Sequence, residues 1–169
     1  MDVLGVGEAA GDLFWTVNGI RLRQQLGSPI VEEREPIKDG WDLHLARAYL
    51  DRLSAPRSGE FPSGHTALLV CECGDLECGA ITVGVDFQDT TVRWSDFRWQ
   101  QPSGWGGVEN ADPPISFTFD RDAYLQTIGA VRERIGRAAT EEPAGVRRAP
   151  LRRRRKLWWR TPSRSRISP

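Results

Sequence analysis

The chain has 169 residues, of which 39% are hydrophobic and 27% charged, as is typical of one soluble globular domain. It contains no run of about 18 apolar residues and begins without a secretory pattern, so we expect no membrane span and a cytoplasmic location. The net charge of zero hides an asymmetry, because ten of the 23 basic residues lie between Arg147 and Arg166. Residues 1–142 then carry a net charge of −10. We predict an acidic domain over 1–142 and a disordered basic tail over 143–169.

The N-terminal part begins with a predicted strand over residues 13–17, which is rich in β-forming side chains. Asn18 and Gly19 follow it, and this pair favours a tight turn because both residues tolerate positive φ. Residues 20–26 then fit either a second strand or a short helix.

A helix is predicted from Asp42 to Leu53, with apolar residues at four-residue spacing on one face. Asp42 is a suitable N-cap, because its side chain can accept hydrogen bonds from the first turn. A turn over residues 61–64 separates this helix from the next apolar segment.

Three cysteines, the chain's full complement, fall within residues 71–78. Extended segments over 66–73 and 79–87 flank the short polar stretch 74–77, which predicts a β-hairpin with a four-residue loop. That loop sets Cys73 opposite Cys78 and Cys71 opposite Ala80. All three thiols would then share one face of the hairpin, although a slip of one residue would undo this.

The C-terminal half of the domain contains two more predicted strands, over 90–94 and 115–119, with a long Gly- and Pro-rich loop over 100–114 between them. Asp120 is the expected N-cap of a final helix over residues 121–138. One apolar stripe on this helix comprises Tyr124, Ile128, Val131 and Ile135. Together these elements predict a single α+β domain, in which two main helices pack on one face of an antiparallel sheet.

The cysteines have three interpretations: buried packing, a metal site, or a redox or regulatory thiol. Zinc is the metal to consider, with Cys71, Cys73 and Cys78 as ligands. A fourth ligand would be His65, Asp75, His44 or water. The spacing is not that of a usual zinc knuckle, so no cofactor is the default expectation. The acidic neighbours would raise the thiol pKa, which argues against a reactive thiolate.

Aromatic residues suggest a second candidate site. Trp94, Trp99 and Trp105 surround a glycine-rich loop, where rings could stack on a ligand or could instead close the core over the sheet. No catalytic motif involves the two histidines, and no P-loop or dinucleotide fingerprint occurs.

The tail is the third candidate. A basic run with adjacent tryptophans could bind nucleic acid or an anionic membrane surface, or it could simply be a disordered extension. The residues concerned are Arg152, Arg153, Arg154, Arg155, Lys156, Trp158, Trp159 and Arg160.

Three motifs resemble an uncharacterised family of small proteins from high-GC bacteria. They are the Cys-Gly-Asp-x-x-Cys-Gly segment at 73–79, Val-x-Trp-x-Asp-Phe at 92–97 and Phe-Asp-x-x-x-Tyr at 119–124. The resemblance spans roughly residues 60–130 and implies no activity. We therefore expect a small binding or interaction domain of unknown ligand. The alternative is a thiol or zinc protein, including an oxidoreductase, that uses the three-cysteine hairpin.

Overall fold

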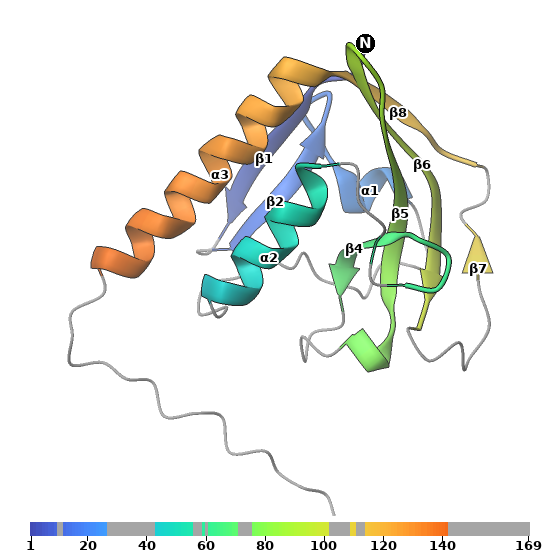
Figure 1. The fold of residues 1–169 in the computed structure, drawn as a ribbon, viewed down its shortest axis with the longest axis horizontal. Helices are drawn as coiled ribbons and strands as arrows, with labels where there is room; N and C mark the ends of the chain where they lie inside the picture. The colour runs from blue at the N-terminus through green and yellow to red at the C-terminus, as the bar shows by residue number, and fades with distance from the viewer. Residues whose placement is uncertain are drawn as a thin grey trace, which may run out of the picture.

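The computed structural model describes residues 1–9, 12–26, 43–55, 59, 61–70, 76–101, 109–110 and 114–141. They form a small α+β domain with two antiparallel sheets rather than the one sheet predicted (Figure 1). The smaller sheet contains β1 (Leu4–Ala9), β2 (Asp12–Val17) and β3 (Ile20–Arg21). The larger sheet contains β4 (Thr66–Val70), β5 (Ala80–Phe87), β6 (Thr91–Gln100), β7 (Glu109–Asn110) and β8 (Phe117–Asp120). The helices are α1 (Leu22–Leu26), α2 (Leu43–Leu53), α3 (Arg121–Glu141) and the short 3-10 turn η2 (Leu76–Cys78).

A tight hairpin and the N-terminal residues join the two sheets. Asn18 and Gly19 have φ of 55° and 78°, which confirms the predicted turn between β2 and β3. The Asn18 side chain accepts a hydrogen bond from the Val3 amide and donates one to Asp2. Asp2 in turn bridges to β8, because its amide donates to the Thr118 carbonyl at 2.7 Å and its carboxylate accepts from the Thr118 amide.

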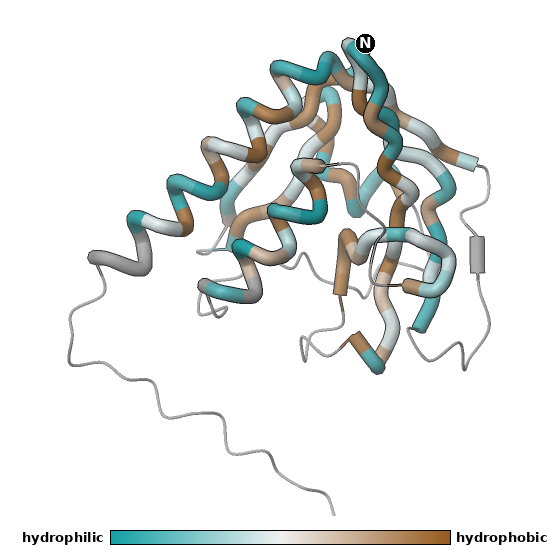
Figure 2. Tube along the Cα trace, viewed as in Figure 1, coloured by the Kyte–Doolittle hydropathy of each residue, from teal (hydrophilic) through white to brown (hydrophobic). Residues whose placement is uncertain are grey.

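Both predicted helices are present and lie side by side (Figure 1). The Asp120 carboxylate accepts a hydrogen bond from the Ala123 amide at 2.9 Å, which confirms the expected N-cap of α3. Tyr124, Ile128 and Val131 are buried, and Ile135 packs partly buried against the same core. Figure 2 shows the hydrophobic stripe of α3 on its inner side.

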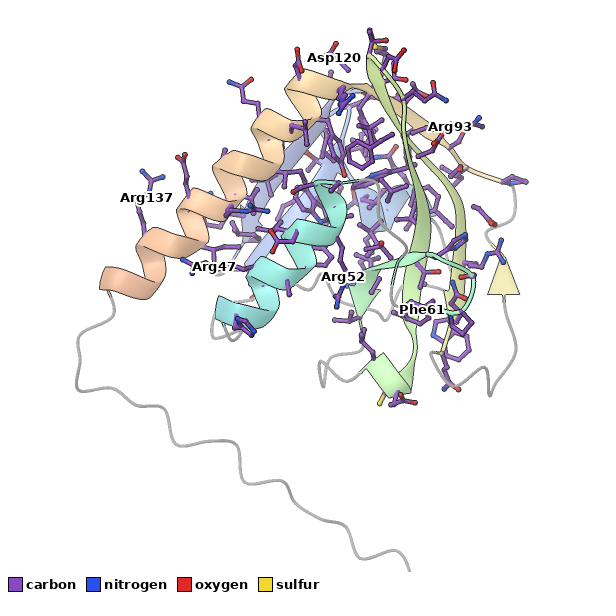
Figure 3. The ribbon with its side chains drawn as sticks, in the orientation of Figure 1. Arg47, Arg52, Phe61, Arg93, Asp120 and Arg137 are labelled. Carbon is purple, nitrogen blue, oxygen red and sulfur yellow. The ribbon has the colours of Figure 1, made fainter. Side chains whose placement is uncertain are left out.

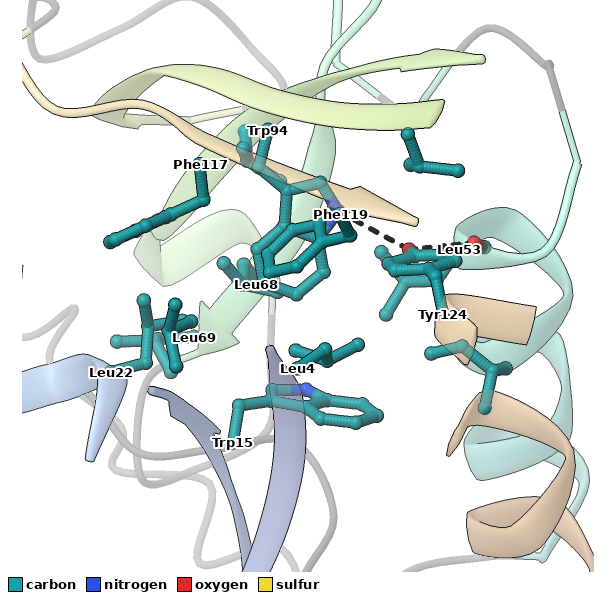
Figure 4. Close-up of a cluster of buried hydrophobic side chains, with 14 of the residues drawn as sticks. Leu4, Trp15, Leu22, Leu53, Leu68, Leu69, Trp94, Phe117, Phe119 and Tyr124 are labelled. Carbon is teal, nitrogen blue, oxygen red and sulfur yellow. Dashed lines mark hydrogen bonds between the residues drawn. The ribbon is translucent and has the colours of Figure 1, made fainter. Parts of the chain in front are cut away.

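The core between the sheets and helices is rich in aromatic rings (Figure 4). Trp15 and Trp94 are fully buried and meet edge to face. Each indole N–H donates a hydrogen bond to a tyrosine hydroxyl: Trp15 donates to Tyr49 at 2.7 Å and Trp94 donates to Tyr124 at 3.2 Å. These hydrogen bonds remove the cost of burying a polar indole nitrogen in an apolar core.

The cysteine hairpin differs from its predicted register. Ala80 pairs with Val70 rather than with Cys71, and Cys78 ends η2 instead of lying in a strand. The physical reasons are an extra residue in β4 near Leu68 and a left-handed turn at Gly79 (φ 101°), which together lengthen the connection. Cys71 and Cys73 lie outside the described residues, so a face shared by all three thiols stays a prediction.

Candidate functional site

A β-bulge in β6 interrupts the regular pairing of the larger sheet. The register with β5 shifts between the pair Thr82–Arg98 and the pair Gly84–Ser95, which leaves one extra residue in β6. Asp96 lies in this bulge with φ of 58°, a left-handed conformation that aspartate tolerates better than most residues. The bulge re-aims the Asp96 carboxylate toward the neighbouring His65, which is the usual effect of such an irregularity.

His65 lies just before β4 and is 8% exposed. Its Nε2 is 3.2 Å from Asp96 Oδ2, and its Nδ1 is 3.5 Å from Thr82 Oγ1. Both ring nitrogens therefore lie within hydrogen-bonding distance of protein oxygens.

A chain of polar side chains continues from His65 across the sheet. Thr82 donates to the Arg98 carbonyl at 3.1 Å and accepts a hydrogen bond from Gln100. The exposed Ser63 hydroxyl donates to Gln100 Oε1 at 3.0 Å. This "His65 network", comprising Ser63, His65, Thr82, Asp96, Arg98 and Gln100, was not predicted from the sequence.

Burial and charge within the network both act on the pKa of His65. Burial lowers the pKa of the His65 imidazole, and the nearby Arg98 guanidinium acts in the same direction. The Asp96 carboxylate opposes this effect, but it is shared with Arg98, whose Nε donates to Asp96 Oδ1 at 3.1 Å. The arginine thus offsets the carboxylate that would otherwise favour imidazolium.

A compact loop over residues 59–65 holds His65 in place. The Gly59 amide donates to the Gly64 carbonyl at 2.9 Å, and the Gly64 amide donates to the Phe61 carbonyl at 2.8 Å. A Cβ atom on Gly59 would lie 1.8 Å from the His65 carbonyl oxygen, so only glycine fits there. The predicted turn over 61–64 is therefore confirmed, and it carries Ser63 and His65 to the network.

Of the predicted cysteine ligands, the structure describes only Cys78, and it lies away from His65. His65 lies beside Gly84, whereas Cys78 precedes Ala80, and four residues of strand span about 13 Å. Among the described residues, no three His, Cys, Asp or Glu side chains form a group that could hold a metal. Cys78 and His44 are both exposed, while Cys71, Cys73 and Asp75 lie outside the described residues.

The predicted tryptophan platform is not assembled from Trp94 and Trp99. Trp94 is fully buried in the core, where its ring meets the rings of Phe119 and Tyr124 edge to face. Trp99 is half-buried, and its ring lies across Gly79 so closely that a Cβ there would be 2.4 Å away. Trp105 and the predicted tail residues lie outside the described part of the chain.

No family model, curated protein or solved structure matches the chain. The family resemblance of the three motifs therefore stays a prediction. Of the helices that the structure describes, none combines the length and the apolar character needed to cross a bilayer.

Proposed function

We propose that the protein is a small binding domain that works without a catalytic centre of its own. The observation that carries this proposal is that both ring nitrogens of His65 lie within hydrogen-bonding distance of protein oxygens. A general base needs a nitrogen or oxygen within reach of a substrate proton. Both nitrogens of His65 are directed at protein oxygens, and Asp96 is engaged by His65 and Arg98.

The network is better suited to hold a surface in shape. It ties the 59–65 loop to β5 and β6 through Ser63, His65 and Asp96. Solvent reaches its outer members, because the side chains of Asp96 and Arg98 are 44% and 25% exposed. A fixed polar surface of this kind suits recognition, since pre-organised groups lose little freedom on binding.

The second candidate is a thiol or zinc protein, and the exposure of Cys78 at the end of η2 favours it. In that case Cys71, Cys73 and Cys78 would bind the metal or react, without His65. A structural zinc contributes folding free energy directly, so its removal would unfold the domain.

The deciding experiment is metal analysis and thiol titration of the purified full chain, with thermal unfolding before and after EDTA treatment. A binding domain should contain substoichiometric metal and keep its Tm. Serine variants of the three cysteines should unfold at nearly the same temperature as the parent. Near-stoichiometric zinc, or a large fall in Tm on chelation, would overturn the proposal in favour of the metal protein.

A further inference from the structure

Asn18 is an exposed turn residue whose side chain is held at both ends by residues 2 and 3. Its side-chain oxygen accepts a hydrogen bond from the Val3 amide, and its side-chain nitrogen donates to Asp2 Oδ1, both at 2.9 Å. The backbone amide of Asn18 donates to the Val3 carbonyl, also at 2.9 Å. The Asn18 carboxamide is therefore fixed against the segment that precedes β1.

Asp2 extends these contacts to the larger sheet. Its Oδ2 accepts a hydrogen bond from the Thr118 amide at 2.8 Å, and its own amide donates to the Thr118 carbonyl at 2.7 Å. Thr118 pairs with Arg93 on β6 and lies two residues before Asp120, the N-cap of α3; Figure 3 labels Arg93 and Asp120. The contacts among Asn18, Asp2 and Thr118, here called the "Asn18 junction", thus connect the smaller sheet to β8.

The sequence Asn18-Gly19 is also the pair in which asparagine most readily loses ammonia. A base removes the proton of the Gly19 amide, and the nitrogen attacks Asn18 Cγ to close a succinimide ring. The bond from Cγ to Nδ2 breaks, and ammonia leaves after taking a proton from water. A second water molecule opens the ring to aspartate or isoaspartate, so the reaction consumes only water. Glycine favours the attack because it carries no side chain that would block the nitrogen.

The Asn18 junction opposes this reaction in the folded protein. Asn18 Cγ can meet the Gly19 nitrogen only if the side chain is free to rotate, and two hydrogen bonds restrain it. The hydrogen bond from Asn18 lowers the pKa of Asp2, and the Thr118 amide acts in the same direction, so Asp2 is ionised at neutral pH. Its negative charge also disfavours the anion that must form on the Gly19 nitrogen.

We propose that Asn18 is a deamidation site that reacts only when residues 2 and 3 leave the hairpin, and that its product prevents their return. The new carboxylate would lie where the carboxamide now lies, 2.9 Å from Asp2 Oδ1. Two carboxylates at this distance repel each other, and the N–H that joined them is gone. A transient opening of the Asn18 junction would thus become permanent. The site uses none of the residues of the His65 network, so it is independent of the proposed function.

The first test measures the rate of Asn18 deamidation in the full chain at mildly alkaline pH, by mass spectrometry of proteolytic peptides. We expect the folded parent to react at least about tenfold more slowly than the same chain unfolded in urea, because a hydrogen bond to a charged group shifts an equilibrium by at least this factor. Asp2→Ala removes the group that holds Asn18 Nδ2, so the folded variant should approach the unfolded rate. In urea the parent and the variant should react equally, which is the matched control.

The second test introduces the product directly. Asn18→Asp adds the carboxylate without altering the turn, since aspartate tolerates the left-handed conformation as asparagine does. Hydrogen exchange of the Thr118 amide, followed by NMR, should become at least about tenfold faster. Combining this change with Asp2→Asn exchanges the two side chains. The amide at position 2 can then donate to the new carboxylate and accept from Thr118, so the double variant should regain the slow exchange of the parent.

Three results would overturn the proposal: a folded parent that deamidates as fast as the unfolded chain, an Asp2→Ala variant that reacts no faster than the folded parent, or an Asn18→Asp variant whose Thr118 amide exchanges as slowly as in the parent. A double variant that exchanges as fast as Asn18→Asp alone would refute charge repulsion as the reason why residues 2 and 3 do not return. Circular dichroism of each variant checks that the rest of the domain stays folded.

Discussion

The Tyr124 hydroxyl is a single polar group on which two buried partners depend. It accepts the Trp94 indole N–H at 3.2 Å and donates to the Leu53 carbonyl at 2.8 Å (Figure 4). Burial raises the pKa of Tyr124, so the hydroxyl keeps its proton as a donor. The variant Tyr124→Phe preserves the ring but leaves the Trp94 N–H and the Leu53 carbonyl without this partner inside the core.

An unsatisfied buried donor or acceptor costs about 1–3 kcal/mol. With two such groups, we expect Tyr124→Phe to lower the free energy of unfolding by about 2–6 kcal/mol. Urea unfolding followed by far-UV circular dichroism measures this change. The control is Thr91→Val, which removes a hydroxyl whose hydrogen bond to Gln88 is exposed, and its effect should stay below about 0.5 kcal/mol. If both variants lose equally little stability, the hydroxyl does not bridge α2, α3 and β6 as described.

Three further predictions concern the core, the loop and pH. Ile128→Ala should lower the free energy of unfolding by about 2–5 kcal/mol in the same urea assay, because Ile128 is 1% exposed. A loss below about 0.5 kcal/mol, the range of surface substitutions, would contradict the burial of this face of α3. Gly59→Ala should displace the 59–65 loop, seen as a changed His65 imidazole resonance in NMR, and an unchanged resonance would contradict the 1.8 Å contact. The lowered pKa of His65 means that the folded state binds fewer protons than the unfolded chain below pH 6.5. The contribution of His65 to stability should therefore be complete above this pH and be lost as the pH drops through the folded-state pKa. His65→Gln should flatten the plot of unfolding free energy against pH.

Sequence reasoning succeeded where the pattern depends on a single element. The stripe of Tyr124, Ile128 and Val131 follows helical periodicity, and Asp120 and Asn18 act on their immediate neighbours. Strand β1 was not predicted, because its glycines supply no alternating pattern. Its stabilisation comes from the neighbouring strand: the Phe14 ring covers Gly7 so closely that a Cβ there would be 2.4 Å away. Such a contact becomes visible only when the partner strand is known.

The candidate site was not predicted because it depends on irregularities in two different strands. The alternation of apolar and polar residues along β6 shifts by one residue between Trp94 and Phe97. Such a shift in the sequence indicates a bulge, here around Asp96. The sequence does not show what the re-aimed carboxylate meets, because that depends on the register of β4, which has its own extra residue near Leu68.

A one-residue change of register moves a side chain to the opposite face of a sheet. The two bulges therefore decide together that Asp96 faces His65. They also explain why loop length alone could not place the cysteines. The bulge at Leu68 lies between His65 and the cysteine segment. The alternation of side chains between the two faces of the sheet is therefore not continuous from one end of β4 to the other. His65 consequently belongs to a network at one end of β4, while Cys78 lies beyond the other end.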